Sequence, residues 1–152
     1  MAFKRVKVTL HHIHNEATGS DPGDELEIYG SFDVARLRFD PNIGEVLSLD
    51  GQNLFFRPDD NPVDLIGGTQ FPVNKSAELT IGDGEFLQIS GHLTEQDTIG
   101  SDDRMESMDF RFGLNEIPSS QVLTDPDGHE LLFHEDDQRV RVKISMVVVG
   151  QG

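Results

Sequence analysis

Two acidic segments of this chain, at positions 16–25 and 95–104, hold the residues best suited to chemistry. The first reads Glu-Ala-Thr-Gly-Ser-Asp-Pro-Gly-Asp-Glu and the second reads Glu-Gln-Asp-Thr-Ile-Gly-Ser-Asp-Asp-Arg. Each places several carboxylates beside Gly and Ser, between two stretches of alternating polar and apolar residues. Calcium takes about six to eight oxygen ligands from flexible carboxylates, carbonyls and waters. The two segments therefore favour a hard-cation site at the ends of strands.

The same segments are also typical of solvated hairpin tips. Asp and Ser side chains in tight turns accept hydrogen bonds from nearby backbone N–H groups, and this needs no metal. If the two segments lie at one end of the domain, their carboxylates repel each other unless a cation or water screens them. The sequence leaves both interpretations open.

The charge of the chain excludes one class of partner. Its 28 acidic and 12 basic residues give a formal net charge of −16, and the Lys and Arg residues are scattered along the sequence. Nucleic-acid binding needs a basic stripe, so we expect no nucleic-acid partner. An acidic surface favours cations or basic partners, or simply keeps the protein soluble.

The chain contains no cysteine, which excludes disulfides, thiol catalysis and thiolate metal sites. Its first residues alternate between polar and apolar, so they do not form the apolar core of a signal peptide. The longest apolar run, residues 146–149, is far too short to cross a bilayer. We therefore expect a soluble protein without a signal peptide or transmembrane segment, and the compartment stays open.

Alternation of polar and apolar residues with a period of two runs through most of the chain and indicates strands with one buried face. Asp and Gly at positions 50–51, 82–84 and 125–128 indicate tight turns between them. Residues 57–75 are expected to form a long loop, with a short helical turn at 63–66. The sequence therefore predicts an all-β, antiparallel β-sandwich of about eight strands in a single domain, residues 1–152. The segments expected to be strands are 5–10, 25–34, 46–49, 53–56, 78–81, 86–93, 108–114, 130–133 and 140–147.

Two parts of the chain resemble C2 domains. Residues 3–34 run from a strand through Gly-Ser-Asp-Pro to a second strand, which is similar to the first calcium loop of that family. Residues 87–105 are similar to the strand that enters the third loop, with its Asp-x-Asp and Gly-x-Asp-Asp segments. The family's Tyr-Val after Asp-Pro is Gly-Asp here, and Glu95 stands where the third loop has its first aspartate. The resemblance implies a C2-like sandwich, with a jelly-roll-like one as the alternative.

The resemblance also implies a set of ligands for Ca²⁺, drawn from both acidic segments. An apolar residue at the tip of the second segment, Ile99, stands where a C2-like module dips into a membrane. The ligands implied by position are Asp21, Glu95, Asp97 and Asp103, with Asp24 and Asp102 adjacent to them.

Other residues with chemical potential give weaker patterns. His12 and His14 lie on one face of the first expected strand, a geometry that a transition metal can use, but the sequence shows no third ligand. Paired carboxylates at 59–60 and 136–137 have the residue type for acid and base catalysis. No motif of a nucleophile, a nucleotide-binding loop or a zinc protease is present, so we expect no enzymatic activity.

These observations leave three functions from different classes. The leading one is a non-catalytic, Ca²⁺-responsive binding module that docks onto an anionic membrane surface or a partner protein. The alternative is a metal-independent structural or assembly subunit, such as an accessory domain of a secreted toxin or multiprotein particle, whose edge strands pair with neighbours and which can form homo-oligomers. A hydrolase that uses the acidic loops ranks last, because no nucleophile, base and orienting group can be named together.

Overall fold

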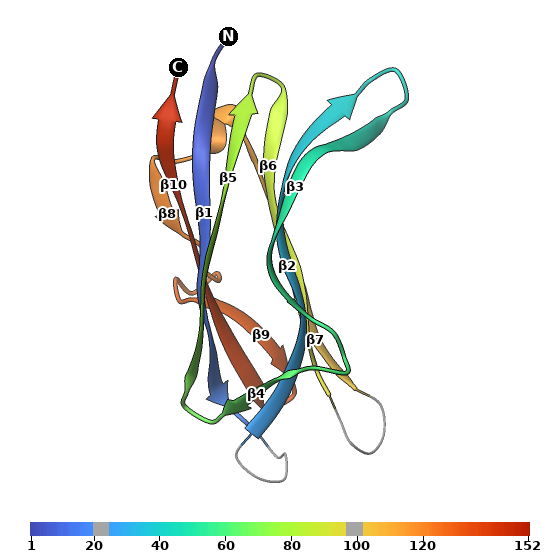
Figure 1. Cartoon of the computed structure of the whole chain (residues 1–152), viewed down its shortest axis with the longest axis vertical. Helices are drawn as coiled ribbons and strands as arrows, with labels where there is room; N and C mark the ends of the chain where they lie inside the picture. The colour runs from blue at the N-terminus through green and yellow to red at the C-terminus, as the bar shows by residue number, and fades with distance from the viewer. Residues whose placement is uncertain (20–24, 97–101) are drawn as a thin grey trace.

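Two antiparallel β-sheets face each other in the computed structural model, which describes residues 1–19, 25–96 and 102–152 (Figure 1). One sheet has the strand order β5-β1-β10-β8, with β9 also paired to β10, and the other has the order β3-β2-β6-β7, with β4 also paired to β2. The prediction of an all-β antiparallel sandwich is confirmed. The elements are β1 (Phe3–Ala17), β2 (Glu25–Asp40), β3 (Glu45–Arg57), β4 (Val63–Ile66), β5 (Gln70–Gly82), β6 (Glu85–Glu95), β7 (Asp103–Gly113), the 3-10 helix η1 (Leu114–Glu116), β8 (Ser120–Val122), β9 (Leu131–Glu135) and β10 (Gln138–Gln151).

The alternation seen in the sequence becomes the inner face of each sheet. In β2, Leu26, Ile28 and Phe32 are fully buried, while the alternate residues at 27, 29 and 31 are half-buried. The register of β1 shifts between Leu10 and His12, and this irregularity keeps both Leu10 and Ile13 inside the core. A strict period of two would have turned one of them outward.

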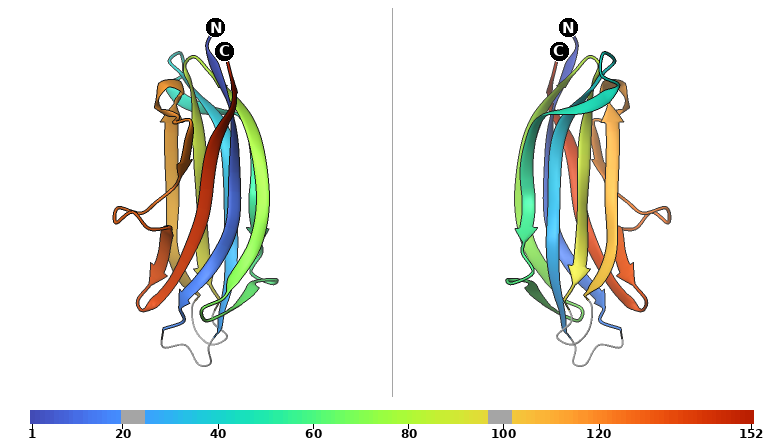
Figure 2. Two further views of the ribbon diagram at one scale, coloured as in Figure 1. Left: turned by 90° about the vertical axis from the view of Figure 1, so that its left-hand side faces the viewer. Right: turned by 90° about the vertical axis from the view of Figure 1, so that its right-hand side faces the viewer.

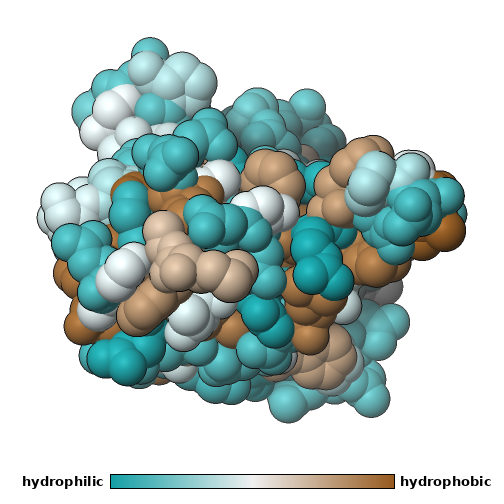
Figure 3. Space-filling view, turned by 90° about the horizontal axis from the view of Figure 1, so that it is seen from above, coloured by the Kyte–Doolittle hydropathy of each residue, from teal (hydrophilic) through white to brown (hydrophobic). Residues whose placement is uncertain are grey.

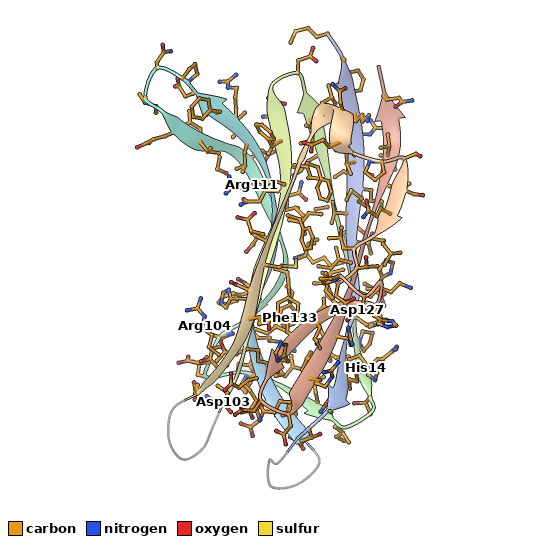
Figure 4. The ribbon with its side chains drawn as sticks, turned by 180° about the vertical axis from the view of Figure 1, so that it is seen from behind. His14, Asp103, Arg104, Arg111, Asp127 and Phe133 are labelled. Atoms are coloured by element: carbon orange, nitrogen blue, oxygen red, sulfur yellow. The ribbon has the colours of Figure 1, made fainter. Side chains whose placement is uncertain are left out.

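Aromatic rings join the two sheets at the centre of the core. Phe32 on β2 meets Phe133 on β9 edge to face, with ring centroids 5.5 Å apart and planes at 86°, and Phe133 lies between the sheets (Figure 4). Gly91 on the neighbouring strand β6 makes room for Phe32, because a Cβ atom at that position would lie 2.2 Å from Phe32 Cδ1. The glycine is therefore required by packing against the ring.

Three expectations from the sequence are wrong in detail. Residues 45–57 form the continuous strand β3, and the Asp-Gly at 50–51 pairs with β2 next to a register shift at Leu49 instead of forming a hairpin. The hairpin lies at 41–44, where Gly44 has a φ of 68° and its N–H donates to Asp40 O. Residues 63–66 form β4 instead of a helical turn, and β5 begins inside the stretch expected to be a loop.

The β2–β3 hairpin extends beyond the sandwich as an arm (Figures 1 and 2). Phe39, Ile43 and Val46 lie on it with 50%, 57% and 45% of their surface exposed. Seen from this end of the molecule, apolar side chains lie on the surface among polar ones (Figure 3). The arm thus carries apolar surface that the opposite sheet does not cover.

The two ends of the chain lie side by side at this same end of the sandwich (Figure 1). Phe3 N donates to Gly152 O at 2.9 Å, and Gly152 N donates to Phe3 O at 3.1 Å. Within the described residues, no helix has the length and apolar character needed to cross a membrane.

Candidate cation site

The strands that flank the two acidic segments meet at one end of the domain, opposite the chain termini (Figure 1). β1 ends and β2 begins there, as do the end of β6 and the start of β7. Ile28 on β2 pairs with Glu95 on β6, and Glu95 in turn pairs with Asp103 on β7. The described ends of both segments are therefore neighbours, which a shared cation site requires.

Three of the six predicted ligands lie within the described residues. Glu95 is the last residue of β6 and is buried, with 3% of its surface exposed. Asp103 is half-buried at the start of β7, where Figure 4 labels it, and Asp102 beside it is exposed. The other predicted ligands Asp21, Asp24 and Asp97, together with Ile99, lie outside the described residues.

Asp102 is held by the single tyrosine of the chain. Tyr29, on the outer face of β2, donates its hydroxyl hydrogen to Asp102 Oδ2 at 2.7 Å. This hydrogen bond, partial burial and the nearby charges of Asp102 and Asp59 raise the pKa of Tyr29 to about 12. The raised pKa of Tyr29 thus indicates a negative electrostatic potential at this end of the sheet.

The turn between β3 and β4 brings two further carboxylates, Asp59 and Asp60, which are exposed. Gln96, directly after β6, donates its side-chain N–H to Asp59 O and its backbone N–H to Glu27 O. This residue thereby ties the second acidic segment to β2 and to the β3–β4 turn. The sequence showed these two aspartates as a pair but did not show where the turn lies in space.

A compact group of carboxylates lies on the outer face of β2 and β4, next to this turn. One oxygen from each of Glu25, Glu27 and Asp64 lies within 4.8 Å of the others. The register explains the grouping, because Glu27 on β2 pairs directly with Asp64 on β4. Sequence reasoning missed this group, since residues 63–66 were expected to form a helical turn.

The inner side of the same end is polar as well. Asn15 on β1 is fully buried and donates its side-chain N–H to Leu65 O at 2.9 Å and to Thr18 Oγ1 at 3.2 Å. Its amide oxygen Oδ1, and Oε1 of the buried Gln138 on β10, accept no hydrogen bond from any described residue. Buried acceptors without donors are costly and uncommon in folded proteins. Two amide oxygens here are thus available to a cation or a water molecule.

The turn between β9 and β10 reaches the end of the first acidic segment. Asp136 has a φ of 50°, which turns the chain tightly. A Cβ atom at Gly19 would lie 2.4 Å from Asp137 Oδ1, so the Asp137 carboxylate packs directly against Gly19. The pair at 136–137 is thus a further source of negative charge at this end.

The histidines of β1 form hydrogen bonds on the outer face of the other sheet. His12 Nε2 lies 2.7 Å from Glu130 Oε1, and His11 Nε2 lies 2.7 Å from Ser145 Oγ. His14 lines a surface cavity of about 410 Å³ together with His129, Glu130 and other polar residues. Within the described residues, the group of three potential metal ligands that lie close together is Glu25, Glu27 and Asp64. This group includes no histidine.

Comparison with known proteins gives no relative in sequence. No family model matches the chain, and no curated protein matches it. Among solved structures, the C2A domain of plant extended synaptotagmin 1 is 11% identical, covers 95% of this chain and 92% of its own, and has a TM-score of 0.46. A C2 domain protein from Ramazzottius varieornatus is 11% identical, with 97% and 90% covered and a TM-score of 0.37.

A third structure, human GIVD cytosolic phospholipase A2, is 11% identical and has a TM-score of 0.37. The match covers 99% of this chain but only 18% of that enzyme. Two of the three structures are named as C2 domains, the family that the two acidic segments resemble. Because each TM-score is below 0.5, the functions of these proteins are not carried over to this chain.

Proposed function

We propose that this protein is a non-catalytic binding module that takes up Ca²⁺ at the acidic end of its sandwich. The bound cation would then bridge the protein to an anionic membrane surface or to acidic groups of a partner protein. One observation carries the proposal: carboxylates from separate segments of the chain meet at this end, on β2, on β4, in the β3–β4 turn and at both ends of the second acidic segment.

The chemistry of the donors favours calcium. All of the grouped side chains offer oxygen, and the chain has no cysteine to offer sulfur. Calcium accepts many oxygens in irregular geometry, whereas magnesium demands a near-ideal octahedron and keeps several of its waters. A site built from exposed carboxylates on two strands and several turns fits the first ion better.

Electrostatics supports a cation at this end. Three carboxylate oxygens within 4.8 Å of one another repel when all are ionised, and a divalent cation offsets this repulsion. An ion that binds only the folded state also stabilises the fold by mass action, by an amount that grows with its concentration. Calcium binding should therefore be visible as a rise in melting temperature.

Tyr29 provides a direct test of the site. It is the only tyrosine, and the chain has no tryptophan, so tyrosine fluorescence of the protein comes from this residue alone. A carboxylate that accepts the phenol hydrogen quenches tyrosine emission. Calcium that engages Asp102 would weaken this hydrogen bond, so the emission should rise in a saturable way at neutral pH, while Mg²⁺ at the same concentration should change it little.

Two variants separate the site from general screening. Asp64→Asn removes a carboxylate from the group on β4, and Asp83→Asn removes one from the β5–β6 turn at the opposite end of the molecule. Thermal melts should show a Ca²⁺-selective stabilisation in the wild type and in Asp83→Asn, reduced in Asp64→Asn. Equal shifts with Ca²⁺ and Mg²⁺, or the same shift in all three proteins, would reject the site.

Docking onto membranes is tested separately. The protein should sediment with vesicles that contain phosphatidylserine when Ca²⁺ is present, and remain in solution with phosphatidylcholine vesicles or with chelator. If Ca²⁺ binds and the vesicles do not, the cation site stands and the anionic surface belongs to a partner protein.

A further inference from the structure

An apolar groove lies between the two sheets beside β7, at the edge of its sheet. Its volume is about 410 Å³. Met108 and Phe110 line it from β7, and Leu131 and Phe133 line it from β9 on the opposite sheet. Both residues of β7 are half-buried and pack against the hydrophobic core. The β7 groove therefore exposes a part of the core to ligands from the side.

The strand that borders the groove has a free edge. Within the described residues, β7 pairs with β6 on one side and with no strand on the other. Such an edge presents unpaired backbone N–H and C=O groups, and an extended peptide can add to it as a further strand. Side chains of an added strand alternate between the two faces, so every second one would point into the groove.

Residues 124–126 add to the far wall of the groove and belong to a shelf, residues 124–130, which projects from the sandwich on the side of β7 (Figure 2). Arg141 holds this shelf on β10, donating to Asp125 Oδ2 at 2.7 Å and to Glu130 O at 2.8 Å. Asp125 Oδ1 in turn accepts from the backbone N–H groups of Asp127 and His129. A second copy of this chain carries the same net charge of −16 and is repelled, whereas a basic segment is attracted.

The rim of the groove carries the acidic side chains of Glu106, Asp109 and Asp127. Asp127 on the shelf is exposed, whereas Glu106 on β7 pairs with His134 Nε2 on β9 at 2.7 Å, and Asp109 on the outer face of β7 pairs with Arg111. Figure 4 labels Arg111 and Asp127 on this side of the molecule. The net charge of −16 adds a long-range attraction for basic ligands. Complementary charge thus calls for basic side chains on the outward face of an added strand.

Together these features identify the occupant. We propose that the β7 groove binds an extended segment of a partner protein in which apolar residues alternate with Lys or Arg. The segment adds antiparallel or parallel to β7, its apolar side chains fill the groove, and its basic side chains face the acidic rim. Two other long strands lie at sheet edges, β3 and β5, and no residue of either lines this groove. β5 is also less suited because Pro72 removes one backbone donor from it.

The test uses a labelled peptide, Lys-Val-Lys-Val-Lys-Val-Lys, added to the full chain in Ca²⁺-free buffer, with affinity measured by fluorescence anisotropy. Two further peptides carry N-methyl groups, one at the valines and one at the lysines. A strand pairs through one edge only, so one methylation pattern should weaken binding roughly tenfold or more, since each lost backbone hydrogen bond contributes a factor of about five, and the other should be tolerated. Equal affinity for all three peptides would show attraction to the acidic surface alone and overturn the proposal.

Protein variants and NMR locate the site. Met108→Lys places a positive charge in the groove and should weaken binding by about tenfold, whereas Val147→Lys, the matched change on the exposed face of β10, should have little effect. Backbone amide shifts on peptide addition should fall on residues 103–113. Shifts on β5 or spread over the whole molecule would contradict the assignment. If Met108→Lys proves unfolded by circular dichroism, the peptide series and the amide shifts on the wild type still decide.

Discussion

The ionisation of Tyr29 gives a quantitative check on the acidic end of the sandwich. The phenol donates to Asp102 Oδ2 at 2.7 Å, and this bond, burial and nearby carboxylates raise its pKa to about 12 from an ordinary value of 10.0. The Asp102 hydrogen bond is the largest cause, and the charge of Asp102 adds to it. Asp102→Asn removes the charge and replaces the charged acceptor by a weaker neutral one, so the pKa of Tyr29 should fall towards 10.0, while the contributions of burial and Asp59 remain.

The assay is an absorbance titration at the tyrosinate band between about pH 8 and pH 13. Because the chain has one tyrosine and no tryptophan, the curve reports a single group. Circular dichroism recorded in parallel defines the range in which the protein is folded, and a titration in concentrated guanidinium chloride gives the unfolded reference. Asp83→Asn, at the opposite end, serves as the control for a general change in net charge.

The sign of the pH effect on stability follows from the same shift. Tyr29 holds its proton more tightly when folded, so its contribution to stability is complete below the unfolded pKa and is lost as the pH rises from about 10 towards 12. Asp102→Asn should flatten this loss. A wild-type midpoint near 10 in folded protein, or equal midpoints in the wild type and Asp102→Asn, would show that the phenol and the carboxylate do not interact in solution.

Three further predictions concern the scaffold. Gly91→Ala should lower stability by about 1–3 kcal/mol, because the new Cβ would lie 2.2 Å from Phe32 Cδ1. The melting temperature should then fall by roughly 2–4 °C for each kcal/mol. The control is Gly51→Ala, which should melt like the wild type because the nearest atom to its Cβ would lie at an ordinary 3.6 Å. The hydrogen bond from Arg141 holds the pKa of Glu16 below its usual range. The contribution of Glu16 to stability is therefore complete above its unfolded pKa and is lost as the pH falls through its folded pKa. In acid denaturation, Arg141→Gln should weaken this pH dependence. Arg141→Gln should also release the 124–130 shelf, measured as faster proteolytic cleavage there than in the wild type; equal cleavage rates would argue against the clamp.

Much of the fold could be predicted from the sequence because burial on one face leaves a period of two. This pattern located β1, β2, β6 and β10, and the turn at 82–84 ended its strands where expected, with Gly84 at a φ of 75°. The Asp-Gly at 50–51 misled because residues typical of a turn also occur inside a strand beside a bulge, here at Leu49, and only pairing with β2 decides between the two. Phe56 lies 63% exposed beside the buried Phe55, whereas the consecutive residues Leu54 and Phe55 are both buried because the register shifts there.

The site was harder to predict than the strands. Counting from Leu93 by twos would have placed Glu95 on the inner face, so its burial had a signal in the sequence. The grouping of Glu27 with Asp64 had none, because it depends on β4 joining the edge of β2 after a turn through residues 58–62. Whether two loops share an end of a sandwich depends on strand parity and on which connections cross between sheets, and neither can be obtained from alternation.

The hydrogen bonds between Phe3 and Gly152 make the molecule nearly a closed ring of polypeptide. A short Gly-Ser bridge between these residues would join the ends without disturbing β1 or β10, and new ends could be opened at the exposed hairpin tip, residues 41–44, where the chain packs against little else. Such a circular permutant would keep every strand pairing while starting and finishing on the arm. It would therefore show whether the order in which the strands are synthesised matters for folding, or only the pattern of their contacts.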